Sequence, residues 1–202
     1  MSNPQRSYYI KQIFDKINTN AFLQMPHLSD QIFELFCYFS KLEQFVSNGK
    51  TPVCESKTNG VFRPNLKPGL TGDHYRLVGV TPSEERNIFL NVKFQGASGI
   101  LHCPDIVVTK TDRTKRFFEK EIVLTIYECK NYSGKIGPGI YREFIGYCKE
   151  LGVSINRSDS KQSALTYTFS VMTPCIYTSG IADVEHKDWL RNTYSISVED
   201  LF

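Results

Sequence analysis

The sequence predicts an α/β protein in which helices flank a central sheet. Two segments, residues 28–47 and 139–151, carry apolar residues at intervals of three and four, which is typical of amphipathic helices. Between them, apolar runs rich in β-branched and aromatic residues recur from residue 74 to residue 130, as in strands. This alternation of helix and strand favours an α/β sandwich over an all-helical bundle.

The composition limits the class of protein. A chain of 202 residues suits one domain, so we expect residues 1–202 to form a single domain with a helical segment over about 1–47. No stretch approaches the roughly 20 apolar residues of a membrane helix, and the start lacks a signal-peptide pattern, which predicts a cytoplasmic protein without membrane contact. Six cysteines without a CxxC pair argue against a disulfide framework or a zinc knuckle. The net charge of +3 permits a polyanionic partner without predicting one.

The first 47 residues predict two helices, at 5–17 and 28–47. At 100° per residue, Glu43 falls on the apolar stripe of the second helix, whereas Glu34 falls on the opposite side, expected to face solvent. Asn48-Gly49 then supplies a stop signal. The residues that define the stripe are Leu28, Ile32, Leu35, Phe36, Phe39, Leu42 and Val46.

The rest of the chain predicts the sheet and its second helical layer. Residues 48–74 are rich in Pro, Gly and Asn, which predicts loops with one short strand at 61–62. After them we expect strands at 74–80, 87–94, 100–108 and 121–130, a helix at 139–151, a strand at 164–173, a short helical stretch at 183–191 and a closing strand at 195–198.

Three charged residues stand at the ends of two of these strands. Glu128 and Lys130 point to the same face of their strand, because side chains alternate with a period of two. Asp105 heads the preceding apolar run, and a polar stretch joins the two strands like a long hairpin. With a turn near residue 115 or 116, antiparallel pairing brings residue 105 opposite about 126–128. The sequence therefore predicts that Asp105 lies beside Glu128.

Two adjacent carboxylates and a lysine fit a hard-cation site, because Mg²⁺ prefers oxygen ligands and keeps waters for chemistry. Mn²⁺ is a possible substitute. In such a site Lys130 orients the metal-activated water or stabilises a pentavalent phosphoryl transition state, which points to phosphodiester hydrolysis. The alternative for Asp105, Glu128 and Lys130 is a structural salt-bridge network.

The pair Pro104-Asp105, followed by Glu128-Cys129-Lys130 at the end of a hydrophobic strand, resembles the PD-(D/E)XK superfamily of restriction-endonuclease-like nucleases. The resemblance implies an αβββαβ core with a central mixed sheet flanked by helices. It also implies a metal held by Asp105, Glu128 and the backbone carbonyl of Cys129, with Lys130 catalytic. An acidic residue on the first core helix often joins such sites, and Glu43 is the position expected to match.

The resemblance covers roughly residues 28–180, and part of the pattern is similar to the Mrr-like branch. Glu128-Cys129-Lys130 is followed by a glycine-containing loop and a helix, and the end of the chain resembles that branch's strand, short helix and final strand. The chain departs from the family on the helix after the motif, where a glutamine or lysine has no clear match. Lys135 or Arg142 is the expected substitute for contacting nucleic-acid phosphates.

The leading hypothesis is therefore a Mg²⁺-dependent endonuclease acting on DNA in restriction, defence or DNA processing. Cutting both strands of a duplex generally needs two active sites, so we expect a homodimer. One alternative is an inactive module of the same fold that binds nucleic acid or protein. Another is an RNase or a structure-specific nuclease. The chain contains no GxSxG, P-loop or HExxH motif, which leaves the serine-hydrolase, kinase and zincin hypotheses without support.

Two further features receive structural interpretations. A basic cluster at the expected hairpin tip lies several residues along the strands from Asp105, so we favour a solvated tip, with contact to nucleic-acid phosphates as the alternative. The cluster comprises Lys110, Arg113, Lys115 and Arg116. His102 is an odd number of residues from Asp105 along an expected strand, which indicates the opposite face and favours a packing or hydrogen-bonded role over metal ligation.

Overall fold

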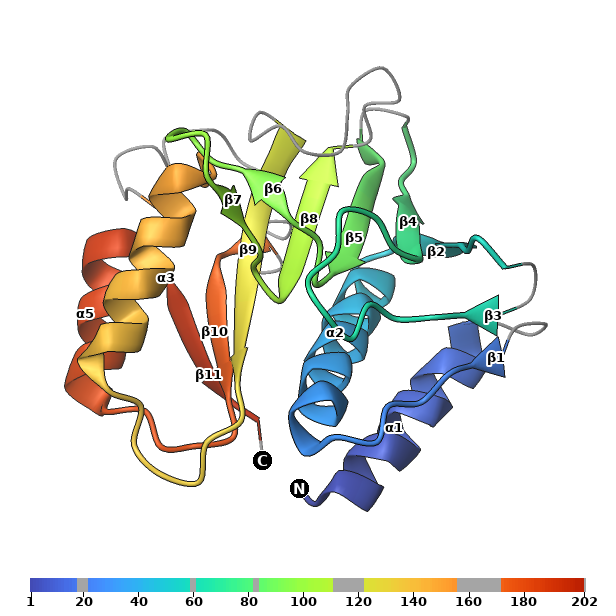
Figure 1. The fold of residues 1–202 in the computed structure, drawn as a ribbon, viewed down its shortest axis with the longest axis horizontal. Helices are drawn as coiled ribbons and strands as arrows, with labels where there is room; N and C mark the ends of the chain where they lie inside the picture. Colours follow the sequence, from blue (N-terminus) through green and yellow to red (C-terminus); the bar gives the residue numbers. More distant parts are fainter. Residues whose placement is uncertain (18–21, 59–60, 82–83, 111–121, 156–171, 202) are drawn as a thin grey trace.

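The computed structural model describes residues 1–17, 22–58, 61–81, 84–110, 122–155 and 172–201. Its centre is a seven-stranded sheet in the order β11-β10-β9-β8-β5-β4-β2 (Figure 1). The strands are β2 (Thr51–Glu55), β4 (His74–Val78), β5 (Arg86–Leu90), β8 (Ile106–Lys110), β9 (Val123–Lys130), β10 (Cys175–Thr178) and β11 (Ser197–Asp200).

The sheet is mixed. The five strands from β2 to β9 pair antiparallel, whereas β9, β10 and β11 pair parallel. Parallel neighbours need a crossover between them, and helix α3 (Pro138–Glu150) lies between β9 and β10 in the chain, as α5 (Val184–Tyr194) lies between β10 and β11. This arrangement confirms the predicted α/β class with a central mixed sheet flanked by helices.

Helices cover both faces of the sheet (Figure 1). Helices α1 (Asn3–Ile17) and α2 (Ser29–Ser47) pack on one face, and α3 and α5 pack on the other. Because side chains alternate along a strand, neighbouring residues of β9 enter different cores: Tyr127 joins the α1/α2 cluster and Ile126 joins the α3/α5 cluster. Among the described helices, none is long and apolar enough to cross a membrane.

Helix α2 is buried on nearly all sides, because α1 packs over the side turned away from the sheet. Its buried residues include Phe33, Tyr38 and Phe39 and also the charged Lys41. A helix enclosed in this way has no solvent-facing stripe over most of its length. The prediction of one wet side, made from the periodicity of α2 alone, is therefore wrong.

Other predictions agree with the structure to different extents. The four predicted helices are present within a few residues of their predicted bounds, and the short strand at Val61–Phe62 (β3) is confirmed, paired with β1 (Phe22–Leu23). Strand β2 lies in a segment predicted as loop; it is an edge strand, where Pro52 needs no ladder partner for its missing N–H. Most of the predicted strand at 164–173, and most of the basic hairpin tip, lie outside the described residues.

The predicted strands at 87–94 and 100–108 are each interrupted. Asn91 adopts a left-handed backbone (φ 52°) directly after β5, and β6 (Phe94–Gln95) then pairs with β7 (Leu101–His102) as a separate two-stranded unit. Pro104 separates β7 from β8, because proline cannot donate a ladder hydrogen bond. Both interruptions occur at the same end of β5 and β8. Asp105, Glu128 and Lys130 lie next to this end of the sheet.

Candidate active site

Asp105 and Glu128 lie side by side at the same end of β8 and β9. The antiparallel register pairs Ile106 with Tyr127, which places the residue before Ile106 opposite the residue after Tyr127. The Oδ2 atom of Asp105 accepts a 2.6 Å hydrogen bond from the backbone N–H of Cys129. The predicted pairing of Asp105 beside Glu128 is confirmed.

Glu128 and Lys130 share one face of β9, as predicted. The Lys130 Nζ atom lies 2.6 Å from Glu128 Oε1, while the Glu128 side chain is 9% exposed. The other carboxylate oxygen, Oε2, is buried and has no hydrogen-bond partner among the described residues. A buried carboxylate oxygen without a donor is unfavourable, so a cation or a donor supplied from outside the chain would stabilise this arrangement.

The charges of the site perturb one another. Burial raises the pKa of Asp105 well above its usual range, and the negative charges of Glu128 and Glu34 raise it further. Burial also raises the pKa of Glu128, although Lys130 opposes the shift. For Lys130, burial alone would lower the pKa, but the charge and hydrogen bond of Glu128 outweigh it and raise the pKa above its usual value. The lysine therefore stays protonated while the carboxylates favour a positive partner.

The backbone of Cys129 also faces this site. Its N–H points toward Asp105, and in a strand the carbonyl of the same residue points to the same side. Continuing the β8–β9 register by two residues from the Ile106–Tyr127 pair puts Pro104 opposite Cys129. Proline has no backbone N–H, so Pro104 cannot donate a hydrogen bond to the Cys129 carbonyl. The thiol lies in the buried α1/α2 cluster, which leaves only the backbone of Cys129 at the site.

Glu34 is the acidic residue of α2 that reaches the site. Its Oε2 atom accepts a 2.9 Å hydrogen bond from the side-chain amide of Asn91, whose backbone N–H donates a 2.8 Å bond to the Asp105 carbonyl. Burial raises the pKa of Glu34, and the charges of Glu128 and Lys130 also act on it. Glu34 is therefore half-buried beside the strand residues, and its predicted placement on a solvent-facing side is wrong.

Glu43, predicted as the helix acid, is engaged on α1. Its Oε2 atom accepts a 2.5 Å hydrogen bond from the hydroxyl of Tyr9, and its Oε1 atom lies 4.0 Å from Lys16 Nζ. Nine residues separate Glu43 from Glu34, which corresponds to about 14 Å along the axis and a half-turn in direction. The structure therefore brings Glu34, rather than Glu43, to Asp105 and Glu128.

Helix α3 adds two polar residues near the motif. The hydroxyl of Tyr147 donates a 2.9 Å hydrogen bond to Glu143, and the charge of Glu143 contributes to the raised pKa of Glu128. Burial and the bond to Glu143 raise the pKa of Tyr147 to about 12. His102 packs edge-on against Tyr147, with ring centroids 5.4 Å apart, and its Nε2 atom lies 3.6 Å from Glu150 Oε2, in agreement with the packing or hydrogen-bonded role predicted for it. Its predicted place on the face opposite Asp105 is wrong, because the strand is interrupted at Pro104 and His102 packs on α3, on the side that Glu128 faces.

The two predicted phosphate-binding residues are exposed. Arg142 lines a cavity of about 350 Å³ between α3 and α5, together with Tyr141, His186 and Trp189. Lys135 follows β9 in a loop that forms a bridge to Ile181. Within the described part of the chain, no hydrogen bond or ion pair joins either side chain to the motif, so their role in binding phosphate stays a prediction.

Asn131 anchors the end of the motif to both N-terminal helices. Its Oδ1 atom accepts hydrogen bonds from Arg6 of α1 at 3.3 Å and from the Ser179 hydroxyl at 2.8 Å. Its Nδ2 atom donates to Ser29 at 3.1 Å and to Asp30 at 2.9 Å at the start of α2. This network holds the residue directly after Lys130 against the helix that carries Glu34. Sequence reasoning missed Asn131 because its partners are remote in the chain.

The donor set suits a divalent cation with oxygen ligands. Within the described residues, no three His, Cys, Asp or Glu side chains form a ready-made metal-binding group. The ends of β8 and β9 offer two carboxylates, those of Asp105 and Glu128, and the carbonyl of Cys129. The buried, partnerless Oε2 atom of Glu128 is the observation that fits a cation there.

The fold and the site together define an α/β protein with an acidic, lysine-containing centre at the end of two antiparallel strands. Comparison of the chain with models of protein families, with curated proteins and with solved structures gives no match. Its function must therefore be inferred from the fold and from the geometry and chemistry of this centre.

Proposed function

We propose that this protein is a Mg²⁺-dependent endonuclease that hydrolyses phosphodiester bonds, with DNA as its substrate. One observation carries the proposal: Asp105 and Glu128 meet across β8 and β9, with Lys130 bound to one oxygen of Glu128 and the other oxygen buried without a partner among the described residues. Two carboxylates and a protonated lysine in one place supply both a cation site and a donor for a phosphoryl oxygen.

The order of elements supports a restriction-endonuclease-like core. Helix α2 precedes the antiparallel strands β5, β8 and β9, and α3 leads on toward β10, which is parallel to β9. With β2 and β4 as additional strands at one edge of the sheet, between α2 and β5 in the chain, this order is compatible with the αβββαβ core of the PD-(D/E)XK nucleases. Asp105 stands at the start of the second of these strands and Lys130 at the end of the third, as in the motif of that superfamily.

The chemistry follows from the residues present. Asp105, Glu128 and the Cys129 carbonyl would hold the cation, which supplies a more acidic bound water and offsets charge on the phosphoryl group. Lys130, kept protonated by Glu128, donates hydrogen bonds to the phosphoryl oxygens and is too weak a base to take the proton of the water. Glu34, fixed by Asn91, orients the attacking water from the helix side.

Cleavage assays test this function. The purified protein is incubated with plasmid, linear duplex, single-stranded DNA and RNA, each in Mg²⁺, Mn²⁺ or EDTA. We expect metal-dependent cleavage of DNA, lowered at least 100-fold by Glu128→Gln and by Lys130→Met, since removing a transition-state charge stabiliser has effects of about that size. Glu43→Gln is the matched control because Glu43 contacts α1. Absence of metal-stimulated cleavage, or cleavage unchanged in both variants, contradicts the proposal.

The same assay separates the alternatives. Metal-dependent cleavage of RNA alone identifies a ribonuclease. Binding of nucleic acid without cleavage identifies a module in which Asp105, Glu128 and Lys130 form a structural network. Cleavage of both strands of a duplex in one event would support the homodimer, which sedimentation of the protein alone tests directly.

A further inference from the structure

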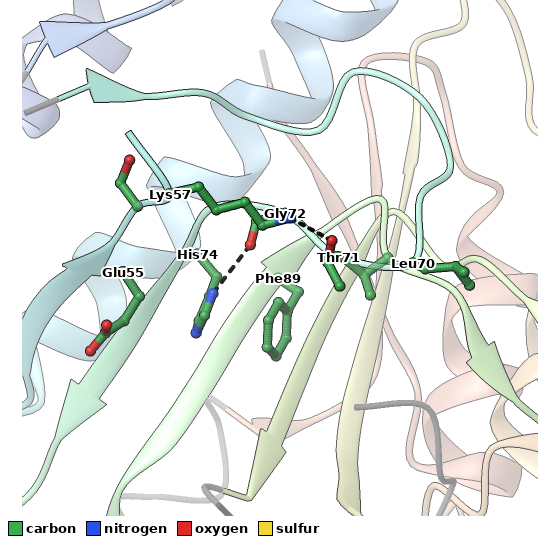
Figure 2. A pocket seen from close by; sticks show the side chains of 9 residues that line it. Glu55, Lys57, Leu70, Thr71, Gly72, His74 and Phe89 are labelled. Carbon is green, nitrogen blue, oxygen red and sulfur yellow. Dashed lines mark hydrogen bonds between the residues drawn. The ribbon is translucent and has the colours of Figure 1, made fainter. Parts of the chain in front are cut away.

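A second feature lies on the same face of the sheet as Glu128. It is a cavity of about 270 Å³ bounded by β4, β5 and the segment 69–72, and Figure 2 shows the side chains that line it. The rings of His74 and Phe89 lie next to each other on neighbouring strands, with centroids 4.4 Å apart and planes 30° apart. The remaining lining residues are Glu55, Ser56, Lys57, Leu70, Thr71, Gly72 and Val92.

The sheet register places this cavity close to the candidate active site. Phe89 pairs with Val107 across β5 and β8, and Val107 pairs with Ile126 across β8 and β9. Asp105 and Glu128 are each two residues beyond this row, on the same face. At about 4.8 Å between strands and 3.3 Å per residue, the backbone of Phe89 is about 12 Å from that of Glu128.

The wall of the cavity is tied directly to the site through Asn91. The backbone N–H of Gly69 donates a 3.0 Å hydrogen bond to the Asn91 carbonyl, and the Lys93 N–H donates a 2.8 Å bond to the Gly69 carbonyl. Asn91 in turn contacts Asp105 through its backbone and Glu34 through its side chain. The segment that encloses the cavity and the acidic site are therefore parts of one connected structure.

The lining of the cavity suits a planar ring with a negatively charged backbone outside it. The half-buried His74 ring supplies a flat surface, with the Phe89 ring, 3% exposed, packed against it, and Leu70, 53% exposed, adds an apolar side chain at the rim. Lys57 extends along the rim, where its amine donates a 2.7 Å hydrogen bond to Thr71 (Figure 2). The Glu55 carboxylate is neutralised by Arg76 at 2.8 Å. Bases stack on such surfaces whatever their sequence, while a rim lysine attracts phosphate.

We propose that this cavity takes one unpaired nucleobase of the polynucleotide whose backbone passes through the Asp105–Glu128–Lys130 site. The inference rests on the proposed nuclease function and narrows its substrate to single-stranded or locally unpaired DNA. At the roughly 3.4 Å rise of stacked bases, about 12 Å corresponds to at most three or four nucleotides, and an extended single strand covers it in fewer, so the bound base lies within about four nucleotides of the scissile phosphate. An intact duplex would have to extrude that base first.

A walk of abasic residues along the substrate tests the proposal without altering the protein. A single-stranded DNA of about 16 nucleotides, near the upper limit for one binding groove, is prepared with one abasic residue at each successive position. We expect kcat/KM to fall about tenfold when the abasic residue lies at one position within about four nucleotides of the cleaved bond, and to stay within about twofold at the positions beside it. A flat profile in a protein that cleaves overturns the base site and leaves the nuclease function standing.

Variants assign the effect to the cavity. The intact oligonucleotide and the one with the abasic residue at the sensitive position are compared in His74→Ala and in Leu70→Ala. Their kcat/KM values should differ by less than about twofold, because each variant has already lost part of the surface on which the base stacks. Val80→Ala is the matched control, since Val80 is an apolar residue 93% exposed that does not line the cavity. A variant that lowers activity equally on all substrates, and retains the abasic dependence, contradicts the assignment.

Binding measurements decide the case in which no cleavage is found. Fluorescence anisotropy of the same labelled oligonucleotides in EDTA then reports affinity alone. Position-dependent loss of affinity for the abasic series, absent in His74→Ala, supports the base site although the nuclease function has failed. Failure to bind single-stranded DNA, or equal affinity for every member of the series, overturns the base site as well.

Discussion

The side-chain amide of Asn91 donates a 2.9 Å hydrogen bond to the carboxylate of Glu34, and its backbone N–H donates a 2.8 Å bond to the carbonyl of Asp105. Asn91 is buried and holds a left-handed backbone with φ of 52°, a conformation that asparagine tolerates better than most residues. One residue thus joins helix α2 to the start of strand β8. This connection brings Glu34 of α2 to Asp105 and Glu128, two of the residues that resemble a nuclease motif.

The helix acid provides the first prediction. Glu34→Gln should lower kcat/KM for metal-dependent cleavage at least tenfold, because it removes a negative charge beside Glu128 and Lys130 while keeping a side chain that can meet Asn91. Glu43→Gln, which alters only the contact with α1, should change the rate less than about threefold. Cleavage rates at saturating Mg²⁺ test both variants. The reverse order of effects would show that Glu43 is the functional acid.

Pro104 provides the second prediction. Pro104→Ala restores an N–H opposite the Cys129 carbonyl, and a ladder hydrogen bond formed there would occupy the carbonyl expected to bind the cation. The Mg²⁺ concentration giving half-maximal activity should therefore rise several-fold, while the rate at saturating Mg²⁺ changes little. A Mg²⁺ titration of both proteins measures this. An unchanged titration curve in a folded variant contradicts a metal-binding role for the carbonyl.

The buried carboxylates predict how stability depends on pH in metal-free protein. The pKa of Asp105 is raised in the folded state, so between its ordinary value of 3.8 and the raised value the folded protein binds more protons than the unfolded chain. Stability is therefore lost as pH rises through this window. Asp105→Asn should flatten the decline and raise the melting temperature in EDTA at pH 8 by about 2–4 °C, the shift that about 1 kcal/mol gives in a chain of this size.

Addition of Mg²⁺ is the matching measurement. A cation bound by the folded protein stabilises it by mass action, so saturating Mg²⁺ should raise the melting temperature of the unaltered protein at pH 8. The same addition should leave the Asp105→Asn variant nearly unchanged. Equal shifts in both proteins would place the cation elsewhere.

Lys41 predicts an opposite dependence on pH. Its amine lies 4.4 Å from the centre of the Tyr127 ring, and burial lowers its pKa from 10.5 to about 8. Between these values the unfolded chain binds more protons, so stability attributable to Lys41 rises with pH from about 8 to 10.5. Below pH 8 the full destabilisation is present, equivalent to about 3 kcal/mol for a shift of this size.

A methionine at this position tests the effect. Lys41→Met should stabilise the protein by about 1–3 kcal/mol at pH 7 and by less at pH 10, because the buried charge is replaced by an apolar chain of similar length. Urea unfolding at the two pH values gives both free energies of unfolding. The exposed Lys11→Met is the control and should change little at either pH. A destabilised Lys41→Met protein at pH 7 would show that contacts of the charged amine outweigh its burial.

Much of the strand part of the site was predictable because it depends on local rules. The same-face placement of Glu128 and Lys130 follows from strand periodicity, and the hairpin between two apolar runs fixed Asp105 within two residues of its partner. The interruptions of the strands were less visible. They depend on the left-handed backbone of Asn91 and on Pro104, whose effect on the pairing of Cys129 emerges only when the two strands lie in register.

The sequence by itself determined the α/β class, the helix and strand periods and the meeting of Asp105 with Glu128, since each follows from spacing within one or two adjacent elements. Only the tertiary structure decided which acid of α2 joins them. Periodicity distinguishes a buried face from an exposed one when a helix has a single buried side, and α1 removes that asymmetry by covering the other side of α2. Glu34, rather than Glu43, reaches the site because Asn91, 57 residues away in the chain, lies there to bind it.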